Sequence, residues 1–270
     1  MKISKQSADT IQDFGRQWQE YTENKGFYAS IEALEGLFHP LLNISDIQNA
    51  TIADVGAGTG RYTLMFQQAG AEKIVALEPS DAYLILKKNI AGLKNIECLK
   101  KRADEIPADG FDFVFCIGVL QFIQDPLPAL KAMKQSLNKS GRIFLWVYSE
   151  ENNRLYLSFV LPLRKLTTSL PHGVLKVLTS IILPLAEIYA LASLACCLFK
   201  LPKLPLSDYL KNYFMRVDRY TRKIIIHDQL NPTYVKYYNK IELKALLKSC
   251  GFDDIKLHHR MGYSWSVLAR

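Results

Sequence analysis

The segment 54-DVGAGTG-60 joins a short β-branched run, residues 51–55, to an amphipathic stretch, residues 61–70. Glycines are needed where a backbone must turn sharply and approach a ligand with no Cβ in the way. A second acid, Glu78, ends the next apolar run, eighteen residues after Gly60. A carboxylate at that place can accept two hydrogen bonds from a ribose diol. Together the turn and the acid predict a nucleoside-binding site.

Short β-branched runs alternate with amphipathic stretches on both sides of this turn, which indicates βαβ units and a parallel sheet with helices on its faces. A fourth strand is expected at 111–118, a helix from Pro126 to about Leu137 capped by Asp125, and a fifth strand at 142–149. After a long interruption, a helix ending at Gly251 precedes two strands, 254–260 and 263–270. These two strands are close enough in sequence to form a hairpin at the sheet edge.

The length and composition are those of a folded protein, with either one large domain or a domain that carries a sizeable insertion. The chain has 270 residues, 49% of them hydrophobic and 22% charged, which excludes a disordered chain. Its net charge of +8 favours an anionic partner without choosing one. The five cysteines show no metal-ligand or disulfide spacing, so reduced thiols and no metal site are expected. The N-terminus lacks the apolar run of a secretory signal, which predicts a cytoplasmic location.

The glycine spacing excludes two common phosphate-binding motifs. Counted from Gly56, the sixth position is Arg61, so the dinucleotide fingerprint G-x-G-x-x-G is not met, and no G-x-x-x-x-G-K-[ST] occurs. An acid followed by G-x-G-x-G resembles the first motif of class I S-adenosylmethionine-dependent methyltransferases. Residues 118-GVLQFIQDP-126 look like that family's GVLHHIPDP, with Gln121 and Phe122 replacing two histidines. Within the family, quinone and small-molecule C- and O-methyltransferases look nearest.

The resemblance implies a doubly wound, Rossmann-like α/β fold with a seven-stranded, mostly parallel sheet and a helical insertion after the fifth strand. Residues 50–148 and 240–270 would form the S-adenosylmethionine-binding domain, 1–49 a helical cap, and 149–239 an apolar, basic substrate lid. In the cap, Ile11, Phe14, Trp18 and Tyr21 recur at helical spacing and are expected in the core, although Trp18 or Tyr21 could instead form a lid.

The same resemblance implies the cofactor site. Glu78 would take the ribose hydroxyls, Asp104 would meet the adenine amino group and Ile117 would pack beneath the ring. Asp54 would hold either the glycine loop or the cofactor's amino group, and Asp104 has the alternative of a solvated turn residue. The implied cofactor-binding residues are Asp54, Gly56, Ala57, Gly58, Gly60, Tyr62, Glu78, Pro79, Asp104, Ile117 and Gly118.

Methyl transfer from a sulfonium is an in-line displacement, in which the protein mainly positions the reactants and can supply a base. The candidate catalytic residues are His227, Asp228 and Tyr148. Residues 227–232 are polar and are expected to form a loop near the pocket mouth, which makes His227 the first choice for a base. The alternative is a surface loop without a catalytic role.

Residues 177–199 form an apolar run with a single charge, Glu187, long enough to count as a transmembrane candidate. One span would separate strands that belong to the same sheet, so spanning is disfavoured. Residues 149–239 carry twelve basic and six acidic residues, so six of the eight net positive charges lie there. Two interpretations remain. The segment is either an apolar lid or an interfacial element that places the protein peripherally at the inner face of a membrane.

An apolar lid favours a hydrophobic acceptor. The expected function is therefore an S-adenosylmethionine-dependent methyltransferase acting on a small-molecule or lipid-like acceptor. A nucleic-acid methyltransferase is disfavoured because residues 116–119, Cys-Ile-Gly-Val, lack the N-P-P-Y-like motif of enzymes that methylate exocyclic base nitrogens. The third alternative is a non-catalytic adenosyl-binding or membrane-associated protein, since a fold does not establish turnover.

Overall fold

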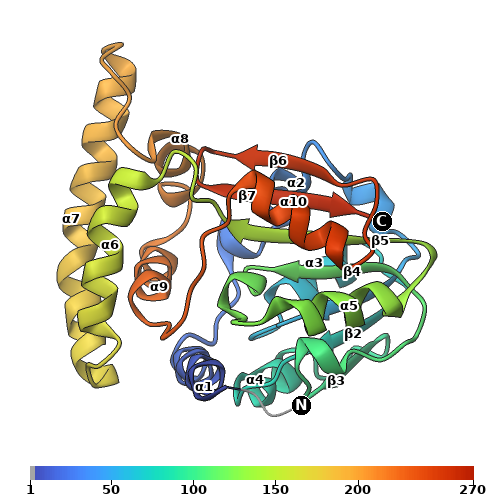
Figure 1. Cartoon of the computed structure of the whole chain (residues 1–270). Coiled ribbons are helices and arrows are strands. Elements are labelled where there is room, and N and C mark those ends of the chain that lie inside the picture. Colours follow the sequence, from blue (N-terminus) through green and yellow to red (C-terminus); the bar gives the residue numbers. More distant parts are fainter. Residues whose placement is uncertain (1–3) are drawn as a thin grey trace.

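One seven-stranded sheet organises the computed structural model, which describes residues 4–270; the first three residues of the expected 1–49 cap lie outside it (Figure 1). The strand order is β3-β2-β1-β4-β5-β7-β6. Only β7 runs antiparallel to its neighbours β5 and β6, so the expected mostly parallel, doubly wound sheet with a terminal hairpin is confirmed. The strands are β1 (Thr51–Val55), β2 (Lys73–Leu77), β3 (Ile96–Leu99), β4 (Phe111–Ile117), β5 (Leu137–Tyr148), β6 (Lys256–Arg260) and β7 (Ser264–Ala269).

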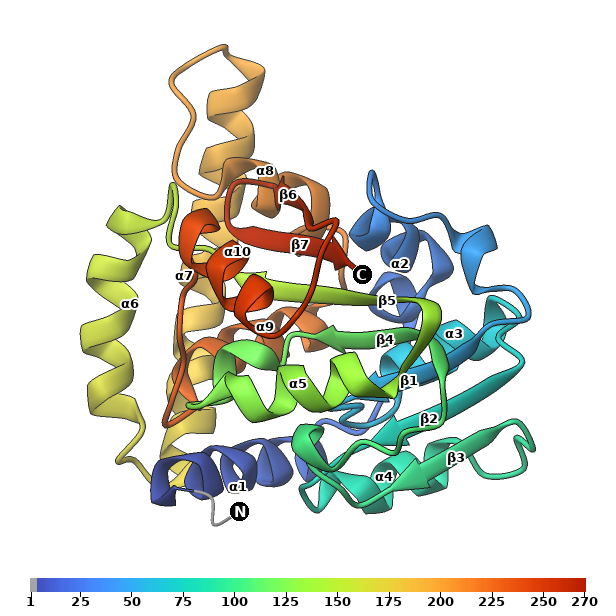
Figure 2. The same cartoon turned by 45° about the vertical axis from the view of Figure 1, so that its right-hand side comes forward.

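Helices cover both faces of this sheet (Figure 2). α2, α3 and α4 pack on one face, and α5 and α10 pack on the other. The α-helices are α1 (Lys5–Glu20), α2 (Ile31–Phe38), α3 (Arg61–Gln68), α4 (Ala82–Asn89), α5 (Pro126–Ser136), α6 (Arg154–Thr167), α7 (His172–Leu198), α8 (Ser207–Tyr209), α9 (Arg219–Leu230) and α10 (Lys240–Ser249). Asp125 caps α5 through its carboxylate, which accepts from the Leu127 N–H at 3.3 Å.

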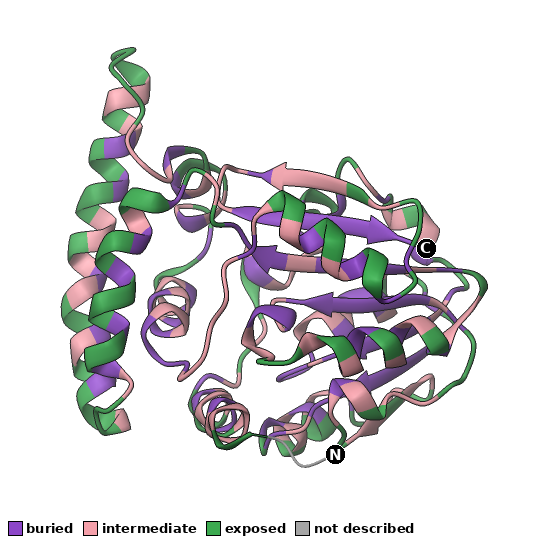
Figure 3. Cartoon of the chain, viewed as in Figure 1, coloured by how far each residue is buried: buried purple, intermediate pink, exposed green. Residues whose placement is uncertain are grey.

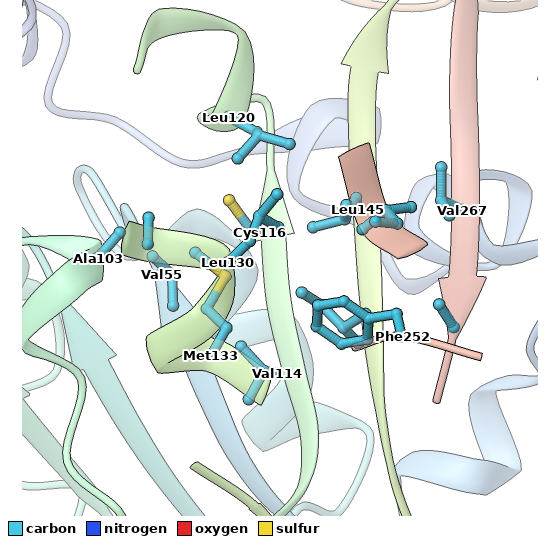
Figure 4. Close-up of a cluster of buried hydrophobic side chains, with 14 of the residues drawn as sticks. Val55, Ala103, Val114, Cys116, Leu120, Leu130, Met133, Leu145, Phe252 and Val267 are labelled. Atoms are coloured by element: carbon cyan, nitrogen blue, oxygen red, sulfur yellow. The ribbon is translucent and has the colours of Figure 1, made fainter. Parts of the chain in front are cut away.

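The sheet is buried on both faces, as the central strands show in Figure 3. On the α5 and α10 side, Met133 and Phe252 pack against Val114 and Leu145 (Figure 4). On the other side, aromatic rings fill the space between sheet and helices, and the Phe66 and Phe115 rings stack at 4.3 Å. Burial of these apolar side chains on both faces is what a parallel sheet requires for stability.

A loop was expected at residues 227–232, but residues 227–230 form the last turn of α9, so that prediction was wrong. The carboxylate of Asp218 caps the helix by accepting from the Thr221 N–H at 2.7 Å. Ile224 and Leu230 give the helix a buried face, which the polar sequence around His227 conceals. The chain leaves the helix only at Asn231. Residues 227 to 229 are therefore held rigidly on a helix.

A polar network fastens α1 to the end of α9. The Asp13 carboxylate accepts from the Thr233 N–H at 3.0 Å and from the Thr233 hydroxyl at 2.6 Å. Asn231 donates to the Asp13 carbonyl at 3.0 Å and to the Gln17 side chain at 2.9 Å. α1 therefore forms part of the body formed by the insertion helices, although almost two hundred residues separate the two segments.

Replacement of Asp13 by alanine should lower the free energy of unfolding by about 1 to 3 kcal/mol, because the Thr233 N–H loses its acceptor. Chemical denaturation of the full chain measures this. Gln12→Ala, at an exposed neighbouring position of the same helix, is the matched control and should leave the free energy nearly unchanged. Equal effects of the two substitutions would show that the network does not hold α1.

Candidate active site

A single cavity of about 1140 Å³ opens at the carboxyl ends of the parallel strands. It is lined by the loops that follow β1, β2 and β4, by the end of β5, and by residues of α1, α6, α7 and α9. β1 lies between β2 and β4, so successive strands are added first on one side of β1 and then on the other. Ligands of open α/β sheets bind at this kind of switch point.

The glycine loop forms the floor of the cavity. Its first N–H groups, of Gly56 and Ala57, both donate to the Leu77 carbonyl, at 2.8 and 2.9 Å. Gly56 has φ +74°, and a Cβ there would come within 2.4 Å of the Val119 side chain. Gly60, with φ +90°, begins α3. Only glycine satisfies both the left-handed backbone and the close approach, so the loop lies flat and exposes its backbone to the cavity.

Glu78 ties the loop to the end of β2. Its Oε2 accepts from the Gly58 N–H at 2.8 Å and its Oε1 accepts from the Ser80 N–H at 2.9 Å. Burial raises the pKa of this carboxyl. A carboxylate has about four lone-pair sites, so both oxygens can accept another bond. Glu78 lines the cavity, and its free acceptor sites fit the adjacent hydroxyls of a ribose.

Asp54 has a different position from the other implied cofactor residues. It is buried below the loop, is not part of the cavity wall, and accepts from the Thr63 hydroxyl at 2.6 Å. Burial raises the pKa of its carboxyl to about 6. Of its two expected roles, these contacts favour the first, in which Asp54 holds the glycine loop to α3. Gly60 also lies outside the cavity wall.

Asp104 faces the cavity from the short 3₁₀ helix Ala103–Glu105. Arg102 binds its carboxylate through two parallel bonds, from Nε at 2.9 Å and from an η nitrogen at 2.7 Å. This partner lowers the pKa of Asp104. The acid is therefore fixed and ionised, as an acceptor for an adenine amino group would have to be. The remaining implied residues in the cavity wall are Gly56, Ala57, Gly58, Tyr62, Pro79, Ile117 and Gly118.

The apolar residues of α1 were expected in the core, but three of them lie at the cavity instead. Ile11, Phe14 and Trp18 are only half-buried and line the cavity. The indole nitrogen of Trp18 lies 3.6 Å from where a Cβ on Gly58 would stand. Tyr21 is buried, 5.6 Å from both the Tyr220 and the His227 rings. α1 borders the open end of the sheet, so its apolar face closes the cavity instead of joining the core.

The far half of the cavity is rich in aromatic and hydrogen-bonding groups, of which the sequence had singled out only Tyr148 and Asp228. The Tyr148 and Tyr237 rings stack at 5.5 Å. Gln229 donates to the Tyr148 hydroxyl at 2.9 Å and accepts from the Tyr156 hydroxyl at 2.8 Å. Arg164 donates to the Gln229 carbonyl at 2.7 Å and to the Tyr237 hydroxyl at 3.1 Å. No motif marks these residues, because α6 and α9 bring them to β5 only in the folded chain.

His227 and Asp228 point in different directions. The His227 ring is buried outside the cavity wall, and its Nδ1 lies 2.9 Å from Gln17 Oε1. Burial lowers its pKa to about 4, which keeps the ring neutral. Asp228 lines the cavity and accepts from the Gln17 amide, and burial raises the pKa of its carboxyl to about 7. The preferred base therefore moves from His227 to Asp228, because consecutive helical residues face different sides.

Tyr148 lines the cavity, as expected of a residue that contacts the acceptor. Burial raises the pKa of its hydroxyl well above the usual value, and the nearby Asp228 carboxyl raises it further. Tyr148 therefore stays protonated at neutral pH and can orient a ligand but cannot act as its base.

Curated relatives match part of the chain. The tRNA U34 carboxymethyltransferase of Campylobacter lari is 30% identical over 119 residues, which cover 42% of this chain and 41% of that protein. The protein of the same name from Campylobacter hominis is 32% identical over 117 residues, 40% of this chain and 39% of its own length. The chain thus spans about two fifths of the length of these relatives.

These names overturn two expectations drawn from the sequence. A small-molecule or lipid-like acceptor was expected, and nucleic acid was considered an improbable partner; both expectations were wrong, because the matching curated relatives are named as tRNA-modifying enzymes. The error has a physical origin. The apolar insertion was interpreted only as a cover that selects the acceptor, whereas part of its apolar surface, such as Ile181 and Ile188, is exposed outside the cavity.

Both the sequence of the core domain and the fold of the chain are similar to those of methyltransferases. Residues 53–145 match the model of the methyltransferase domain. A SAM-dependent methyltransferase from Mesorhizobium loti has the same fold, with a TM-score of 0.53 at 15% identity over 92% of this chain and 99% of that one. Another from Thermotoga maritima has a TM-score of 0.51 at 16% identity, over 95% of this chain and 97% of that one. The glycine loop and Glu78 lie within the matched residues, so residues 53–145 form a methyltransferase domain, and the whole chain has the fold of S-adenosylmethionine-dependent methyltransferases.

Proposed function

We propose that this protein transfers a methyl or substituted methyl group from an S-adenosyl sulfonium to a base of tRNA. The observation that carries the proposal is the stacked pair Tyr148 and Tyr237, with the Gln229 amide beside it, in the same cavity as the glycine loop. The names of the curated relatives support tRNA as the acceptor. The net charge of +8 suits the approach of a phosphate backbone.

S-adenosylmethionine, held at the glycine loop, would supply the electrophilic carbon. Glu78 would accept the ribose hydroxyls, Asp104 the adenine amino group, and Ile117 would pack against the ring. The loop backbone, held by its own bonds to Leu77 and Glu78, would fix the position of the reacting carbon relative to the far half of the cavity. Such positioning can supply roughly 7 to 11 kcal/mol of an in-line displacement.

Tyr148 and Tyr237 offer a surface on which an unstacked base can lie. Enzymes that modify a base in a nucleic acid extrude it into a pocket, where aromatic side chains stack on it and polar groups read its edge. Gln229, a donor and an acceptor in one group, suits the edge of uracil. Uracil has no exocyclic amino group, so the missing N-P-P-Y-like motif does not count against this acceptor.

Asp228 is the group we assign as the base. Its carboxylate faces the cavity from α9, and its raised pKa makes it a proton acceptor near neutral pH. Gln17 holds the carboxylate in place from α1. A uridine oxygen or carbon nucleophile would bond to the transferred carbon as the carbon–sulfur bond of the sulfonium breaks and the thioether, S-adenosylhomocysteine when the donor is S-adenosylmethionine, leaves, and its proton would pass to Asp228.

Glu78→Ala should weaken binding of S-adenosylhomocysteine about 10- to 100-fold, because two hydrogen bonds to a charged acceptor are lost. Isothermal titration calorimetry with the full chain measures the affinity. Glu97→Ala, a substitution on the same sheet but outside the cavity wall, is the control and should not change it. Unchanged affinity in the Glu78 variant would remove this residue from the site.

The pH profile of transfer should rise through about pH 7, because Asp228 accepts a proton only when it is ionised and its folded pKa is about 7. Asp228→Asn should remove that rise and lower kcat roughly 10²- to 10⁴-fold. The affinity for S-adenosylhomocysteine should stay the same. A variant that keeps the wild-type pH profile would exclude Asp228 as the base.

Transfer of radiolabel from methyl-labelled S-adenosylmethionine to bulk tRNA tests the acceptor. A parallel assay uses a labelled donor in which the methyl group on sulfur carries a carboxylate. Tyr237→Ala should raise KM for tRNA by roughly 5- to 100-fold, since stacking contributes about 1 to 3 kcal/mol per base. Tyr83→Ala on α4, outside the cavity wall, is the matched control. Cofactor binding without label in tRNA from either donor would contradict the proposed function.

A further inference from the structure

Exposed apolar side chains are concentrated on one part of the surface. Of the nineteen exposed large hydrophobic residues in the described chain, sixteen lie between Leu155 and Leu201, and the other three are Leu84, Leu127 and Ile241. These residues lie on α6 and α7, which form a helical hairpin, and on the segments beside them, and we call the sixteen residues the hairpin face. They are Leu155, Phe159, Leu161, Leu163, Leu166, Leu170, Val174, Val177, Ile181, Leu185, Ile188, Tyr189, Leu191, Leu198, Phe199 and Leu201. Four of them, Leu155, Phe159, Leu163 and Tyr189, also reach the cavity, and the other twelve lie outside its wall. Contiguous apolar surface of this kind marks an interaction site.

α6 and α7 each turn one face to the protein and the other to solvent. On α7, Leu175, Leu183 and Ala190 are buried against the helices beneath. The opposite side carries Ile181 and Ile188, which are 59% and 63% exposed. Figures 1 and 3 show both helices at the outer side of α9, away from the sheet, with much of their length exposed. The solvent-facing sides of α6 and α7 are therefore apolar. A surface helix of a globular protein carries polar residues on that side.

Positive charges border the hairpin face. Exposed basic residues stand at the start and end of α6, at Arg154 and Lys165, near the start of α7, at Lys176, and beyond its end, at Lys200 and Lys203. From residue 154 to 206 the sequence has one acid, Glu187. Its carboxylate is turned to α9, where Arg222 and Arg219 bind it at 3.2 and 3.4 Å. Two of the basic residues pair with acids outside this range, Lys176 with Glu20 at 3.4 Å and Lys203 with Asp208 at 2.9 Å. The five cations outnumber these two acids, so the border is net positive.

α7 has the length and composition of a membrane-spanning helix, with 17% of its most apolar window buried. Its packing opposes a span. Arg222 and Arg219 on α9 pair with Glu187 at the middle of α7, so α9 lies alongside it at the same depth. β5, which precedes α7, and β7, which follows it, pair in one sheet. Both flanking segments must remain on the same side of any bilayer, so α7 can lie only in the plane of its surface.

We propose that the hairpin face docks this protein on an anionic lipid surface. The apolar side chains enter the boundary between headgroups and acyl chains, and the bordering lysines and arginines bind the headgroup phosphates. Such docking makes the protein peripheral to a membrane. A second copy of the chain fits this face less well. Two such faces would bring two net positive borders together, and the neighbouring acids Glu20 and Asp208 already pair with Lys176 and Lys203.

Co-sedimentation of the full chain with vesicles tests the proposal. Phosphatidylcholine vesicles containing about 30% phosphatidylglycerol should carry the protein into the pellet at low salt, whereas pure phosphatidylcholine should bind it less well. The double variant Ile181→Glu, Ile188→Glu should lose about ten-fold or more in affinity for the anionic vesicles. Leu84→Glu, Ile241→Glu places two charges at equally exposed positions outside the hairpin face and should bind as the wild type does.

A charge-reversal variant, Lys165→Glu, Lys200→Glu, tests the basic border independently and should bind the anionic vesicles several-fold more weakly, with less dependence on salt. Three results would overturn the proposal. The first is full retention of the wild type in the supernatant. The second is a stable dimer without vesicles that Ile181→Glu dissociates. The third is resistance to extraction by alkaline carbonate after expression in cells, which would indicate a span.

The proposal does not depend on the tRNA acceptor. Ile181 and Ile188 do not line the cavity, so their double variant should keep the wild-type rate of transfer to soluble tRNA. Loss of vesicle binding with full transfer activity supports docking alone. Normal vesicle binding without any transfer to tRNA would contradict the proposed function and leave the docking surface intact.

Discussion

The glycine loop must lie flat against the end of the sheet, and the Glu78 carboxylate is the group that holds it there. One carboxylate oxygen accepts from the Gly58 N–H and the other from the Ser80 N–H, which joins the turn after β1 to the turn after β2. Asp54 supports the same loop from below through Thr63. A cavity at the strand ends exists because these backbones are fixed without side chains between them. Everything placed around that cavity takes its geometry from this floor.

α9 connects the remaining parts of the molecule. On its cavity side it presents Asp228 and Gln229, on its α1 side it packs His227 against Gln17, and on its outer side Arg222 binds Glu187 of α7. One helix thus positions the catalytic candidate and supports the hairpin face. Its polar side chains are hydrogen-bonded to neighbouring elements, His227 and Asp228 to Gln17 of α1 and Gln229 to tyrosines of β5 and α6, and these bonds fix their orientation.

The cavity and the hairpin face differ in chemistry although both belong to the insertion. Tyr148, Tyr237 and Gln229 give the cavity a hydrogen-bonding aromatic wall, and the outward sides of α6 and α7 are apolar with a basic border. The apolar residues of the insertion therefore belong to two surfaces: Ile182, Leu204 and Ile226 line the cavity, whereas Ile181, Leu185 and Ile188 are exposed outside it. The composition of the insertion alone does not separate these two surfaces.

The sequence by itself determined the sheet and pointed to the glycine turn and Glu78. Period-two strands, helical stretches between them and a turn that only glycine can form are local properties that spacing reveals, whereas the role expected of Asp104 came from the resemblance to a known family. The rest needed the tertiary structure. Asp228 in place of His227, Trp18 in the cavity wall and the Gln229 network depend on which side of α1 or α9 faces inward. That is decided by packing between segments almost two hundred residues apart, which no local pattern records.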